Sequence, residues 1–97
     1  MSIDYTEVKA GTILKVPHVG LTDDGCIYLV VSKIRRRQNK IYIYASHTVR
    51  YCNSILNITT FDDPYAYTEE RFKSEITILK GKKLAKLKQD LKKENDK

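Results

Sequence analysis

The chain is poor in cysteine, glycine and proline. Its two cysteines, Cys26 and Cys52, form no CxxC pair. Disulfide-stabilised domains of this size usually carry at least four cysteines, and zinc sites need closer Cys and His spacing. We therefore expect free thiols, no metal site and no cofactor. Only 4 glycines and 2 prolines occur in 97 residues, which excludes collagen-like and low-complexity chains.

Long apolar runs are also lacking. The longest, Ile27–Val31, is far shorter than the roughly 20 residues that a membrane-spanning helix needs. Residues 1–7 have no basic segment followed by an apolar one, so we expect no secretory signal. A length of 97 residues allows one domain with a modest core. The sequence therefore predicts a small cytoplasmic domain without membrane attachment.

Charge is abundant and unevenly distributed. The net charge is +6, from 18 basic and 12 acidic residues. Residues 25–61 contain no Asp or Glu, and their cations are Lys33, Arg35, Arg36, Arg37, Lys40 and Arg50. Residues 62–79 are acidic in balance, and residues 80–97 are rich in lysine. A polyanionic partner should therefore meet the central block, the C-terminal block or both.

Alternation of apolar and polar residues dominates the first 80 positions. We expect five strands, at residues 11–16, 26–34, 41–51, 55–60 and 74–80. Residues 17–25 and 35–40 should be connections, and residues 61–67 irregular, followed by a single helical turn from Thr68. The predicted core residues are Ile27, Leu29, Val31, Ile41, Ile43, Ile76 and Ile78.

The pattern becomes helical from Lys82. Leu84, Leu87 and Leu91 lie on one helical face among lysines, and we expect them to dock on the β-barrel predicted for the preceding residues, while residues 92–97 fray. Five short strands and one helix indicate a mainly β protein. The expected fold is a small five-stranded antiparallel barrel or roll (1–81), followed by a basic C-terminal helix (82–97).

The order of these elements resembles SH3-like small β-barrels. As in KOW and Tudor-type members, a glycine, Gly11, opens the first strand and another, Gly25, precedes the second. The likeness covers roughly residues 8–60 and implies an SH3-like barrel. A more distant similarity is to the PemK and MazF-like toxins, through the valine-rich strand at Leu29–Val31. Those ribonucleases have an Arg-Pro pair where this chain has Gly25-Cys26, which argues against their activity.

The third predicted strand carries the main candidate site. Its outward parity contains Tyr42, Tyr44, Ser46, Thr48 and Arg50, whereas Ile41, Ile43, Ala45, His47 and Val49 should face inward. Aromatic rings beside cations suit single-stranded nucleic acid, because bases stack on rings while phosphates meet cations. The candidate nucleic-acid or partner-binding residues are Lys33, Arg35, Arg36, Arg37, Lys40, Tyr42, Tyr44, Thr48 and Arg50.

Other interpretations stay open. The same face, or the acidic segment 61–75, could bind and modulate a host protein, and tyrosines on a sheet can simply stabilise it. A third hypothesis is a small ribonuclease using His47, Arg50 and Tyr51. Lys82, Lys83 and Lys86 form a secondary basic group. The small size and the Lys, Ile, Tyr and Asn-rich composition favour an accessory protein of a bacteriophage or mobile element.

Overall fold

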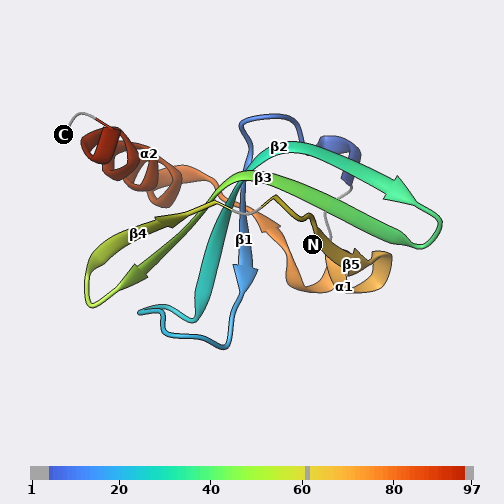
Figure 1. The fold of residues 1–97 in the computed structure, drawn as a ribbon, viewed down its shortest axis with the longest axis horizontal. Helices are drawn as coiled ribbons and strands as arrows, with labels where there is room; N and C mark the ends of the chain where they lie inside the picture. Colours follow the sequence, from blue (N-terminus) through green and yellow to red (C-terminus); the bar gives the residue numbers. More distant parts are fainter. Residues whose placement is uncertain (1–4, 61, 96–97) are drawn as a thin grey trace.

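A computed structural model describes residues 5–60 and 62–95 and shows a mainly β protein (Figure 1). A short 3-10 turn, η1 (Tyr5–Glu7), precedes the first strand. The strands are β1 (Ile13–Pro17), β2 (Cys26–Arg37), β3 (Lys40–Cys52), β4 (Ile55–Thr59), β5 (Tyr65–Thr68) and β6 (Thr77–Ile78). Helix α1 (Glu69–Glu75) lies between β5 and β6, and α2 (Gly81–Asn95) follows β6.

The strands form one open antiparallel sheet. Its order is β4-β3-β2-β1-β6, and β5 pairs with β3 beside β4, farther along the same edge. The mainly β class is confirmed, but the described residues form six strands and two α-helices where we predicted a five-stranded barrel and one helix. The fifth strand, predicted at residues 74–80, is limited to β6. Residues 61–67, which we expected to be irregular, include most of β5, which pairs with residues 40–43.

Helix α1 is longer than the single turn expected from the sequence. Its N-cap is Thr68, whose hydroxyl oxygen accepts a hydrogen bond from the Arg71 backbone N–H. Phe72 points from α1 into the core and is fully buried. That burial stabilises a helix too short to persist alone in water.

The hairpin of β2 and β3 is the longest feature of the sheet. Arg37 pairs with Lys40, so only Gln38 and Asn39 form the turn, and Gln38 adopts a φ of 57°. The prediction that residues 35–40 form a connection is therefore wrong: residues 35–37 continue β2. Because they are in a strand, successive arginines project from opposite faces.

Two bulges interrupt this hairpin. The register shifts between Val30 and Val31 and again between Val31 and Lys33, leaving Ser46 of β3 and Ser32 of β2 outside the ladder. The Ser46 hydroxyl donates to the Val30 carbonyl and the Ser32 hydroxyl to the Tyr44 carbonyl. Each bulge reverses which parity of its strand faces a given side. The predicted single alternation from Ile41 to Tyr51 therefore fails at Ser46.

Each face of the sheet has its own apolar cluster. The first is covered by α1 and β5 and contains Val8, Leu14, Val16, Ile27, Leu29, Val31, Ile41, Ile43, Phe72 and Ile76. The second is covered by α2 and contains Ile13, Tyr28, Val49, Leu79 and Leu87. All predicted core residues are buried except Ile78, which is half-buried at the end of β6.

The predicted docking of α2 is confirmed. Leu87 is 2% exposed, and Leu84 and Leu91 pack against the second cluster. None of the helices in the described chain is long and apolar enough to cross a membrane. The helix continues to Asn95, and residues 96–97 lie outside the described part, so fraying of the terminus stays a prediction.

We expect Leu29→Ala to lower the free energy of unfolding by about 2–5 kcal/mol, because Leu29 is fully buried between β1 and β3. Urea denaturation monitored by circular dichroism would measure the loss. Val19→Ala is the matched control, because Val19 is fully exposed and its truncation should change stability little. Equal effects of the two substitutions would contradict the assignment of β2 as the central strand.

Candidate functional site

The β2–β3 register brings cations and tyrosines together on one face. Lys33 lies opposite Tyr44, Arg35 opposite Tyr42, and Arg37 opposite Lys40. Ile34 packs on the first cluster, so its neighbours in β2 project to the other side of the sheet. We call this surface the tyrosine–basic face; its residues are Lys33, Arg35, Arg37, Lys40, Tyr42 and Tyr44.

Both tyrosine rings are half-buried and flanked by cations. The Lys33 Nζ lies 4.5 Å from the centroid of the Tyr44 ring, within range of a cation–π interaction. Tyr42 lines two shallow hollows of about 290 and 450 Å³. One is shared with the arginines and Tyr44, and the other reaches the turn at Gln38 and Lys40. The face thus offers ring surface and positive charge side by side.

The cations of this face lack carboxylate partners among the described residues. Within the described residues, Lys33, Arg35, Arg37 and Lys40 form no ion pair with a carboxylate. Arg36 differs, because it projects to the opposite side, where its Nε lies 3.1 Å from Glu69 Oε1. The arginine triplet therefore contributes two cations to the face and one to an ion pair with α1.

Three other predicted groups lie elsewhere. The Ser46 bulge turns Thr48 and Arg50 to the opposite side, so the expected continuous row from Tyr42 to Arg50 is wrong. Thr48 is 6% exposed, and its hydroxyl lies 2.8 Å from the Tyr65 hydroxyl. The C-terminal lysines also stand apart, because α2 and the β2–β3 turn lie at opposite ends of the molecule (Figure 1).

The grouping considered for a ribonuclease is not assembled. His47, predicted to face inward, is exposed and lies opposite Val30 on the side of the second cluster. Arg50 projects from the other side of the sheet, and the Tyr51 hydroxyl donates to Asp90 of α2. The described residues include no group of three or more His, Cys, Asp or Glu side chains placed to hold a metal ion.

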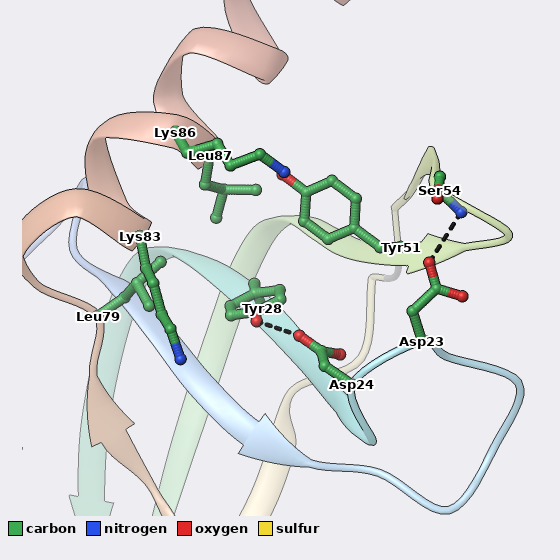
Figure 2. A pocket seen from close by; sticks show the side chains of 9 residues that line it. All are labelled: Asp23, Asp24, Tyr28, Tyr51, Ser54, Leu79, Lys83, Lys86 and Leu87. Atoms are coloured by element: carbon green, nitrogen blue, oxygen red, sulfur yellow. Dashed lines mark hydrogen bonds between the residues drawn. The ribbon is translucent and has the colours of Figure 1, made fainter.

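A pocket beneath α2 was not foreseen from the sequence. It has a volume of about 400 Å³, and Tyr28 and Tyr51 form its floor (Figure 2). The two rings pack edge to face, with 6.3 Å between their centroids. Leu79 and Leu87 form the apolar side, and Lys83 and Lys86 lie along α2. The Lys86 Nζ already has two partners there: it lies 4.9 Å from the Tyr51 ring centroid and 3.8 Å from the Asp90 Oδ2.

Adjacent aspartates hold the opposite wall of this pocket. Both Asp23 carboxylate oxygens accept backbone N–H groups at 2.8 Å, one from Asn53 and one from Ser54. Figure 2 shows the bond from Ser54. Those turn residues both have positive φ, as a two-residue hairpin turn of this hand requires. The Asp24 carboxylate accepts from the Cys26 N–H and from the Tyr28 hydroxyl.

Burial raises the pKa of both Tyr28 and Tyr51 above the usual tyrosine value. Their hydrogen bonds to Asp24 and Asp90 act in the same direction, because ionisation would remove the donated proton and place two anions together. These tyrosines stabilise the fold as neutral donors.

No family model, curated protein or solved structure matches the chain. The function is therefore inferred from the geometry of the protein itself.

We expect the free energy of unfolding to fall as pH rises above about 10, because tyrosines of the unfolded chain then ionise before Tyr28 and Tyr51 do. A variant with Tyr28→Phe and Tyr51→Phe should be less stable at neutral pH but lose less stability on passing from about pH 9 to 11. Urea melts across this range would compare the slopes. Parallel curves for the two proteins would contradict the assignment.

Proposed function

We propose that the protein is a non-enzymatic binding module that holds single-stranded nucleic acid on its tyrosine–basic face. The observation that carries this proposal is the pairing of Lys33 with Tyr44 and of Arg35 with Tyr42 across the ladder. Each ring therefore has a cation directly opposite it. Such pairs suit a nucleotide, whose base can stack on the ring while its phosphate meets the cation.

The spacing of the tyrosines favours single-stranded nucleic acid over a duplex as the ligand. Tyr42 and Tyr44 project from one side of β3 about 7 Å apart, a distance that successive unstacked bases can span. The rings of Tyr42 and Tyr44 lie beside the sheet surface, so they cannot reach the base edges inside the groove of a duplex. Arg37 and Lys40 at the end of the hairpin can follow the phosphates onward.

A variant with Arg35→Glu and Arg37→Glu should bind a single-stranded oligonucleotide more weakly and with a shallower salt dependence, because fewer counterions are released. Fluorescence anisotropy at two salt concentrations would measure both effects. The control is Lys9→Glu with Lys73→Glu, which changes net charge equally at exposed residues outside the face. If both variants bind equally, or if the unaltered protein does not bind at low salt, the proposal fails.

Replacing Tyr42 and Tyr44 with alanine should weaken binding by about 1–3 kcal/mol per stacked base while leaving most of the salt dependence intact. The matched control replaces both with phenylalanine, which keeps the rings and removes only the hydroxyls. Anisotropy should place the phenylalanine variant close to the unaltered protein. An alanine variant that binds as tightly as the phenylalanine variant would contradict stacking on these rings.

A second candidate function, binding to a host protein, is favoured by exposed apolar side chains at another site. Val19 and Leu21 lie in the β1–β2 loop, and Ile55 begins β4; they are 104%, 79% and 64% exposed. Asp23 joins these two segments through its bonds to the Asn53–Ser54 turn. Exposed apolar side chains on linked surface segments are typical of protein interfaces.

We further propose that the sheet is an open relative of the SH3-like roll. In support, a long loop separates β1 from β2, two hairpins follow, and β6 returns beside β1. In this interpretation β5 and α1 are an insertion before β6. A cytoplasmic accessory protein of a phage or mobile element is the setting that we propose for such a module.

A further inference from the structure

A separate hollow lies on the side of the sheet opposite the tyrosine–basic face. Its volume is about 400 Å³, and residues of β1 to β5 contribute to its lining. It lies beside a gap in the sheet edge: β4 pairs with β3 only from Thr48 onward, and β5 only up to Ile43. The size falls within the range of small-molecule sites.

Arg50 is the distinctive side chain of this hollow. It is half-buried, and no described carboxylate pairs with it. No Asp or Glu is among the described residues that line the hollow. A partly desolvated guanidinium without an anion is costly, and carboxylate or phosphate oxygens match its planar fork of donors.

The rest of the lining is largely apolar or aromatic. Val16 and Ile27 contribute aliphatic surface, and Tyr65 and Tyr67 contribute rings from β5. The polar lining side chains besides Arg50 include His18, Thr48, Thr59 and Tyr65. Two polar contacts are already made within the wall: the Thr48 and Tyr65 hydroxyls hydrogen-bond each other, and the Thr59 hydroxyl donates to the Thr48 carbonyl. Arg50 thus supplies positive charge at the side of an apolar chamber.

We propose that this hollow binds a small molecule that carries a carboxylate or phosphate on an apolar or aromatic body. The oxyanion pairs with Arg50, and the body lies against Val16, Ile27 and the β5 tyrosines. This site is independent of nucleic-acid binding, because it uses the other side of the sheet.

Phenylacetate and phenyl phosphate are suitable probes, with 2-phenylethanol as the uncharged analogue and inorganic phosphate as the anion without a body. Titration of the ¹⁵N-labelled protein should give saturable shifts at amides around Arg50, Ile27 and Tyr67 with at least one aryl anion. The uncharged analogue should bind about tenfold more weakly, or worse, because it lacks charge-assisted hydrogen bonds. Preference between the two aryl anions shows which oxyanion the site accommodates better.

Arg50→Gln should weaken aryl-anion binding about tenfold or more, and Arg50→Lys should fall between, since lysine keeps the charge but not the fork. Arg35→Gln is the matched control, because Arg35 lies on the tyrosine–basic face and should leave these shifts unchanged. If Arg50→Gln does not fold, Arg50→Lys and the uncharged analogue decide the result. The proposal is overturned if no probe gives saturable shifts at millimolar concentration, if phenylethanol binds as well as the anions, or if substitutions of Arg50 have no effect.

Discussion

The two bulges in the β2–β3 hairpin are the constraint on which the rest of the structure depends. Without Ser46 outside the ladder, β3 would direct all its odd residues to one side, and a single cluster would have to accept Ile41, Ile43, Val49 and Tyr51. With it, one strand supplies apolar residues to two cores. The two bulges lie on facing strands, so their register shifts cancel and the hairpin remains paired to its end.

The same shifts decide where the cations go. Continued alternation of β2 beyond Val31 would aim Lys33 and Arg35 at the first core, where an unpaired charge is costly. The bulge at Ser32 places Ile34 there instead and sends the odd-numbered cations to solvent. Arg36 reaches the core side but meets Glu69 at its margin. An apolar core and a strongly basic surface therefore share one hairpin.

The sequence predicted the parts of this arrangement that depend on local pattern. Alternation located β2 and β3, and the helical spacing of Leu84, Leu87 and Leu91 indicated the docked helix. A bulge at a serine has no signature in the pattern of apolar and polar residues. The change of side after Ser46, which buries Thr48 and exposes His47, was therefore not predictable. Short β5 was missed for another reason: its pairing with residues 40–43 is stabilised by tertiary contacts rather than by its own four residues.

The candidate site divides in the same way. Alternation predicted that Tyr42 and Tyr44 share one side of their strand, and β3 is regular over these residues. The cations opposite them were expected in a connection, so their pairing with β3 was not predicted. Arg50 was assigned to the wrong side because a bulge intervenes, and its hollow is built from segments far apart in the sequence. No linear spacing relates Val16, Arg50 and Tyr67.

Asp23 limits how the β1–β2 loop can vary. Its backbone N–H donates to the Tyr51 carbonyl, and its carboxylate holds the Asn53–Ser54 turn, so the last part of the loop is attached to another hairpin. Residues added between Pro17 and Leu21 would lengthen an exposed tip. The same addition between Asp23 and Cys26 would move Asp23, which is bonded to the β3–β4 hairpin, away from the start of β2. One half of the loop can therefore accept insertions, while the other half must keep its length.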